Sequence, residues 1–158
     1  MPKLLKNGAL IEDAWIEIGA EEDLPAGPAV IPVARLPQVS HAPLGIRVPS
    51  NLDVESLRND LSRLALIVLD FPKFIDGRAY SQGRKLREMG FKGELRATGN
   101  VLPDQLLFMH RCGFDAFVLA KGDPIASWTH AMSLYSGFYQ PAADGTMPAF
   151  LRRRARAQ

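Results

Sequence analysis

Leu64-Ala65-Leu66-Ile67-Val68-Leu69-Asp70 is the stretch that decides the fold of this chain. It is apolar without a break before Asp70 and too short for a typical helix, which indicates a strand covered on both faces. Strands of this kind occur in parallel sheets, where crossover helices pack against the sheet. The stretch therefore predicts an α/β domain.

Strand–helix units repeat around this stretch. The sequence predicts strands at 44–48, 64–69, 94–98 and 114–119, and helices near 53–63, 77–89, 103–112 and 124–138. Four consecutive units predict a four-stranded parallel sheet with right-handed crossovers. We prefer a doubly wound, flavodoxin-like strand order. The alternative is a sequential order that resembles half of a β/α barrel.

The first third of the chain has a different pattern. Asn7-Gly8 stands between two short apolar runs and predicts a tight hairpin. Several prolines from Pro25 to Pro43 then predict an irregular connector. We therefore divide the chain into an N-terminal hairpin and Pro-rich connector over 1–43, a βα-repeat domain over 44–140, and a flexible basic C-terminal tail over 141–158.

Composition limits the setting of the protein. The 158 residues fit one domain, and the formal net charge is +2. Four arginines in 152–156 carry this excess, and without them the chain has 15 basic and 17 acidic residues. A nucleic-acid-binding face on the folded body is therefore not expected, although the tail itself is either a solvated end or a contact for nucleic acid or an acidic partner. The single cysteine and the lack of a long apolar run predict a cytoplasmic protein without a membrane contact.

Ligands of parallel sheets bind at the carboxyl ends of the strands, so the loops there supply the candidate site. The candidate ligand-binding residues are Asp70, Lys73, Asp76, Arg78, Asn100, Lys121 and Asp123. Lys73 and Arg78, with the N–H groups of a helix start, could hold a sulfur oxyanion or phosphate. The alternative is that Asp76 caps the helix, Arg78 pairs with a local carboxylate and Lys73 is solvated.

Recognisable catalytic and cofactor motifs are missing from the sequence. It has no glycine pattern for a dinucleotide or a phosphate loop and no nucleophile elbow, and its three histidines lack metal-ligand spacing. No cofactor and no metal are predicted, and the catalytic residues, if any, stay unknown. Cys112 falls at a helix end, where a thiol is poorly ionised, which predicts an inert cysteine.

The last predicted helix has an apolar arc wider than one core face requires. Trp128, Met132 and Tyr135 lie on it. This arc is either buried between the sheet and the N-terminal segment or forms the interface of a homo-oligomer, because aromatic residues and methionine are enriched at interfaces.

Several sequence blocks also carry a family resemblance. They are Phe71-Pro72-Lys73-Phe74-Ile75-Asp76-Gly77-Arg78-Ala79-Tyr80-Ser81, Val101-Leu102-Pro103-Asp104-Gln105-Leu106 and Arg111-Cys112-Gly113-Phe114-Asp115-Ala116. Over about residues 44–139 the chain resembles a bacterial domain-of-unknown-function family whose members are commonly labelled as oxidoreductases of sulfite reduction. Gly83, where alanine is expected, is a small departure.

The resemblance implies a role in assimilatory sulfur metabolism, with sulfite reductase as a partner, and no catalytic residues. Two hypotheses follow. The first is a non-catalytic accessory or partner protein of sulfite reduction. The second is an enzyme, either a motif-poor oxidoreductase or one that acts on a small sulfur oxyanion at the strand ends.

Overall fold

The computed structural model describes residues 4–40, 42–119 and 121–156. Its centre is an eight-stranded sheet in the order β2-β1-β8-β7-β6-β5-β4-β3. Six strands, β3 to β8, follow one another in chain order, and each is parallel to its neighbour. The strands are β1 (Leu4–Lys6), β2 (Ala9–Ile11), β3 (Ile16–Glu17), β4 (Ala29–Pro32), β5 (Leu44–Val48), β6 (Leu64–Phe71), β7 (Glu94–Gly99) and β8 (Ala116–Val118).

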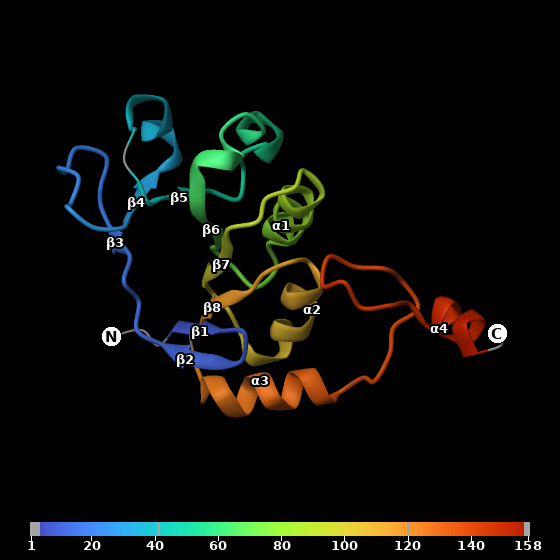
Figure 1. Cartoon of the computed structure of the whole chain (residues 1–158). Coiled ribbons are helices and arrows are strands. Elements are labelled where there is room, and N and C mark those ends of the chain that lie inside the picture. The colour runs from blue at the N-terminus through green and yellow to red at the C-terminus, as the bar shows by residue number, and fades with distance from the viewer. Residues whose placement is uncertain (1–3, 41, 120, 157–158) are drawn as a thin grey trace.

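The sheet is open and curled, and the helices that follow its central strands lie on one side of it (Figure 1). This arrangement fits the half-barrel alternative, and the preferred flavodoxin-like order is not confirmed. The apolar pattern of β6 correctly predicted a strand with two buried faces, but helices do not cover both of them. The second face of β6, with Leu66 and Val68, is buried by Val30 and Trp15 instead of by helices.

The helices are shorter than the pattern predicts. They are α1 (Arg78–Glu88), α2 (Leu106–Arg111), α3 (Pro124–Ser133) and α4 (Ala149–Arg156), and a 3-10 turn over Pro103–Gln105 leads into α2. The predicted helix over 53–63 is instead two 3-10 turns, Val54–Leu57 and Leu61–Arg63. Another 3-10 helix covers Val33–Gln38. None of the described helices is long and apolar enough to cross a membrane.

The predicted hairpin at Asn7-Gly8 is present, and it is part of the sheet. β1 pairs antiparallel with β2 on one side and with β8 on the other. Leu4 and Leu5 are buried at 2% and 0% exposure. The N-terminal segment also contributes β3 and β4 to the far edge of the sheet. The alternation Trp15-Ile16-Glu17-Ile18 predicts a half-buried strand where β3 lies, whereas the prolines from Pro25 to Pro43 predict only loops and short edge pieces where β4 lies. The proposed domain limits at 43 and 140 stay predictions.

The wide apolar arc of the last helix has two parts. The Trp128 ring lies 5.6 Å from Phe117 and 5.3 Å from His110, so it packs against the body of the protein. Tyr135 lies beyond the end of α3 and is 65% exposed. Self-association through Trp128, Met132 and Tyr135 stays a prediction.

Candidate functional site

The β6–α1 loop, Pro72–Gly77, follows the longest strand and contains two of the predicted site residues, Lys73 and Asp76, and a third, Arg78, is the first residue of α1. The Asp76 carboxylate accepts hydrogen bonds from Arg78 Nε at 2.9 Å and Nη2 at 2.7 Å, and from Ser50 Oγ at 3.0 Å. It also accepts one from the backbone N–H of Arg78 at 3.2 Å. The hydrogen bonds from Arg78 hold the pKa of Asp76 well below its usual range. Arg78 is therefore already paired, and Asp76 fixes the base of the loop.

The tip of this loop is apolar and points into solvent. Ile75 is 86% exposed and Phe74 is 53% exposed. Lys73, beside them, is exposed and has no ion-pair partner among the described residues. The loop thus has a hydrogen-bonded base and a large apolar tip. Folding alone does not require such a tip, because these two exposed side chains contribute little to the stability of the core.

Within the described parts of the chain, the other predicted site residues form no hydrogen bond with Lys73, Asp76 or Arg78, and their hydrogen-bond partners lie elsewhere. The backbone N–H of Asn100 donates to the carbonyl of Phe71 at 2.7 Å. Asp123 caps α3 by accepting from the backbone N–H of Ala126 at 2.9 Å, and Lys121 is exposed. Asp70 points to the open face of the sheet. Binding of an anion by these residues stays a prediction.

The open face, which is the face of the sheet turned away from α1 and α2, carries a network of charged side chains that the sequence reasoning missed. Arg47 donates from Nη2 to Glu17 at 2.6 Å, from Nη1 to Thr98 Oγ1 at 3.1 Å, and from Nη1 to Asp70. Thr98 Oγ1 in turn donates to Asp70 at 2.7 Å. The hydrogen bond to Glu17, more than the nearby charge of Asp70, raises the pKa of Arg47.

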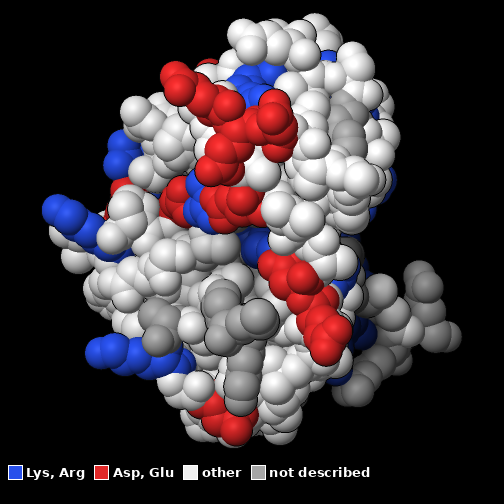
Figure 2. All heavy atoms as spheres, turned by 90° about the vertical axis from the view of Figure 1, so that its left-hand side faces the viewer, with Lys and Arg blue, Asp and Glu red and all other residues white. Residues whose placement is uncertain are grey.

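A second arginine, on β7, lies deeper in the same face. Arg96 is buried, and it donates from Nη1 to Asp13 at 2.6 Å and from Nε to Glu94 at 2.8 Å. Lys6 of β1 donates to the other oxygen of Glu94 at 2.7 Å. Figure 2 shows acidic side chains in a band, with basic side chains between them, on the side of the molecule away from α4.

A cavity of about 180 Å³ opens between these groups. Its lining includes Trp15, Val68 and Val118 together with the two paired arginines. Because the guanidinium groups are already satisfied by carboxylates, an incoming anion would have to displace an internal partner. The signal for this face was the alternation Glu94-Leu95-Arg96-Ala97-Thr98, which places three polar side chains on one side of a strand.

Cys112 is buried, and burial raises the pKa of its thiol. The thiol is therefore protonated near neutral pH, in agreement with the inert cysteine expected from the sequence. No group of three or more His, Cys, Asp or Glu side chains in the described parts of the chain could hold a metal ion.

These features define an α/β protein of half-barrel form, with one sheet face that carries no helix and one exposed apolar loop. The chain belongs to the family described as "Bacterial protein of unknown function (DUF934)", whose model matches residues 45–150. No curated protein and no solved structure matches the chain. The family model begins within β5 and therefore does not include the hairpin or the edge strands β3 and β4.

Proposed function

We propose that this protein is an accessory partner of sulfite reductase in the cytoplasm, and that it binds the reductase through the β6–α1 loop. The link to sulfite reduction comes from the sequence resemblance. The choice of surface comes from one observation, the exposure of Phe74 and Ile75 at the tip of a loop whose base is fixed.

The physical argument concerns the cost of binding. An isoleucine and a phenylalanine that are already exposed lose their contact with water when a partner covers them, which favours association. A loop held by the Asp76–Arg78 pair and Ser50 loses little conformational freedom at that moment. Large apolar anchors at the centre of an interface supply most of its binding free energy.

Aromatic residues next to the start of α1 extend this surface. The Tyr80 ring lies 4.7 Å from Phe108 and 5.0 Å from Phe71. Phe108 is 58% exposed, whereas Phe71 is buried in the core. The exposed Phe108 ring is therefore held by a cluster of edge-on and tilted rings that ends in the core, which restricts its motion.

The test is direct binding to the sulfite reductase of the same bacterium, with wild-type protein and a Phe74→Ser/Ile75→Ser variant. We expect the variant to bind at least about tenfold more weakly, because interface anchors commonly have effects of this size. The matched control is Leu134→Ser/Tyr135→Ser, which changes two other exposed apolar residues. Equal affinity of wild type and loop variant would contradict the proposal, as would equal losses in both variants.

A second candidate is an enzyme that acts on a sulfur oxyanion at the strand ends. The observation that favours it is the exposed Lys73, a cation without an ion-pair partner among the described side chains, close to the N-terminus of α1. Sulfite should then raise the midpoint of thermal unfolding of wild type more than that of Lys73→Glu at matched ionic strength. Equal shifts would remove this candidate.

A further inference from the structure

The C-terminal helix α4 is both apolar and strongly basic. Phe150 and Leu151 are 50% and 40% exposed, and arginines occupy positions 152, 153, 154 and 156. Arg152 donates to the carbonyl of Ser136 at 2.9 Å, and Arg153 and Arg154 form no ion pair with the described residues. Figure 1 shows α4 at the far side of the molecule from β3, away from the sheet. The helix therefore has an uncovered face with apolar and cationic groups.

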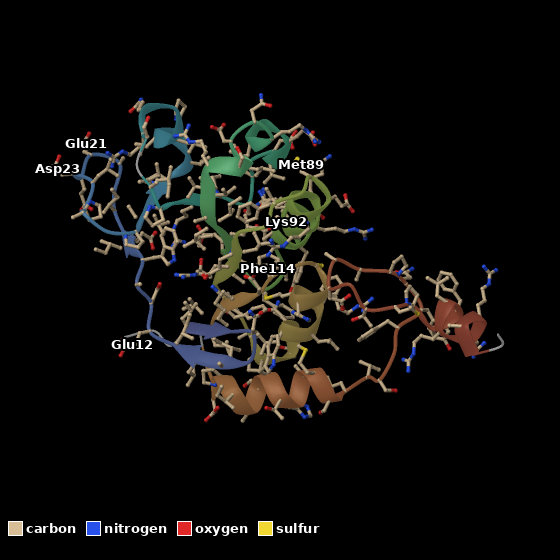
Figure 3. The ribbon with its side chains drawn as sticks, in the orientation of Figure 1. Glu12, Glu21, Asp23, Met89, Lys92 and Phe114 are labelled. Carbon is tan, nitrogen blue, oxygen red and sulfur yellow. The ribbon has the colours of Figure 1, made fainter. Side chains whose placement is uncertain are left out.

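The opposite side of the molecule carries the complementary charge. We call residues 12–23 the acidic segment, because it has six carboxylates and no Lys or Arg. Its acidic residues are Glu12, Asp13, Glu17, Glu21, Glu22 and Asp23. Figure 3 shows Glu12, Glu21 and Asp23 pointing away from the body of the protein.

The two arginines of the open face form ion pairs with only two of the six carboxylates of this segment. Asp13 and Glu17 pair with Arg96 and Arg47. The other four carboxylates of the segment form no ion pair with the described residues. One cation lies beside the segment, because Arg35 Nη1 donates to the carbonyls of Gly19 and Glu22, each at 2.8 Å. The four carboxylates without an ion pair outnumber it. Figure 1 shows β3 of this segment and the arginine-bearing helix α4 at opposite ends of the molecule, so the two cannot meet within one molecule.

The acidic segment also offers apolar contacts. It contains β3, the edge strand of the described sheet, which pairs with β4. Ile16 of β3 is 49% exposed, and Leu24, just after the segment, is 38% exposed. These side chains match the exposed Phe150 and Leu151 in kind, so the two surfaces are complementary in both charge and apolarity.

We propose that helix α4 of one copy binds the acidic segment of a second copy. Two copies side by side in opposite directions bring each α4 to the acidic segment of the other, so one two-fold axis satisfies both contacts. The surface is separate from the β6–α1 loop, and the proposal is therefore independent of the proposed function.

The first experiment exchanges the charges. One variant carries Arg153→Glu and Arg154→Glu, and the other carries Glu21→Lys and Asp23→Lys. We chose residues that are exposed and form no ion pair with described side chains, so that folding is unaffected, which circular dichroism checks. The mass in solution is measured by analytical ultracentrifugation after nuclease treatment.

We expect wild type to form a dimer whose dissociation constant rises at least about tenfold in either variant, because like charges then face each other. An equimolar mixture of the two variants should associate as wild type does, since each contact again joins opposite charges. In wild type alone, raising NaCl to about 0.5 M should weaken the dimer, because salt screens charges in solution.

Four results would overturn the proposal. The first three are a monomeric wild type at all concentrations, variants that dimerise as tightly as wild type, and a mixture that associates no better than its components. Loss of association on nuclease treatment would also overturn it, because α4 would then bind nucleic acid.

Discussion

Arg96 is a charged side chain in the middle of a sheet, only 6% exposed and paired with Asp13 and Glu94. Replacing it by methionine keeps much of its volume but leaves the Glu94 carboxylate, itself 7% exposed, with Lys6 as its remaining ionic partner. We expect Arg96→Met to lower the free energy of unfolding by roughly 3–5 kcal/mol, as measured by urea denaturation.

The matched control for this change is Arg58→Met. Arg58 pairs with Glu55 on the surface, where its side chain is 56% exposed. Exposed pairs contribute about 0–1 kcal/mol, so this variant should unfold almost as wild type does. Similar losses at both arginines would show that burial of Arg96 has no special effect.

The raised pKa of the Cys112 thiol predicts that this cysteine reacts slowly in the folded protein. In the folded protein at pH 8 its thiol should react with iodoacetamide at least about tenfold more slowly than in concentrated urea, because less of it is ionised and access is restricted. The rate should rise with pH above the ordinary thiol range. Cys112→Ser should also leave growth on sulfate intact. A folded thiol that reacts as fast as the unfolded one would contradict this.

Helix α1 approaches the sheet through Gly83. A Cβ atom at this position would lie 2.6 Å from Cε2 of Phe114, whose side chain is 1% exposed and has no room to move. This close contact explains the glycine where the family resemblance led us to expect alanine. We expect Gly83→Ala to destabilise the protein by about 1–3 kcal/mol in urea unfolding, although alanine is the better helix former.

Two comparisons identify the cause. Gly77→Ala, where no atom lies within 4 Å of the new Cβ, should change stability little. In a Phe114→Leu background, which opens space beside the helix, Gly83→Ala should lose most of its cost. An undiminished cost in that background would mean that Phe114 is not the source of the strain.

Element by element, the sequence predicted the central strands better than the polar site. β6 and β7 were found because their residue patterns are local. The predicted helix over 53–63 fails because Asp53 caps only a short 3-10 turn by accepting from Glu55 N–H at 3.0 Å. The open-face network joins residues far apart in the chain, such as Asp13 and Arg96, and a local pattern cannot reveal such pairs.

For the whole molecule, a parallel βα arrangement could be predicted, but the number of parallel strands could not, because β3 and β4 extend the four predicted strands to six. The strand order was left between two alternatives. A strand with two apolar faces looks the same whether helices cover both faces or, as at Leu66 and Val68, Trp15 and Val30 cover one of them. The β6–α1 loop does lie at the carboxyl end of a parallel strand, as predicted, and its role as a binding site stays a prediction. Its pairing of Arg78 with Asp76 was one of two alternatives that the sequence left open.

The hairpin is part of the whole sheet, and its removal should show this. Deleting the chain up to Ile11 removes the buried Leu4 and Leu5 and leaves β8 as an exposed edge. The loss of these two side chains alone should cost about 4 kcal/mol, a large share of the stability of a typical domain. We expect an unfolded or aggregated protein by circular dichroism and light scattering.

A truncation before Ala149, which removes the exposed helix α4, is the control. Because Phe150 and Leu151 are largely exposed, this protein should keep the urea unfolding curve of wild type at protein concentrations low enough for both to be monomeric. A stable hairpin deletion with an unchanged curve would mean that β1 contributes little to the sheet.

The pairing of β1 with β8 sets a time order for biosynthesis. Leu4 leaves the ribosome well before its partner Val118, which is added much later. At roughly 5–20 residues per second, the interval is on the order of ten seconds. An isolated two-stranded hairpin is marginally stable in water, so the β1–β2 hairpin stays without β8 during that interval. Chaperones that bind apolar nascent segments therefore have their longest opportunity at Leu4 and Leu5.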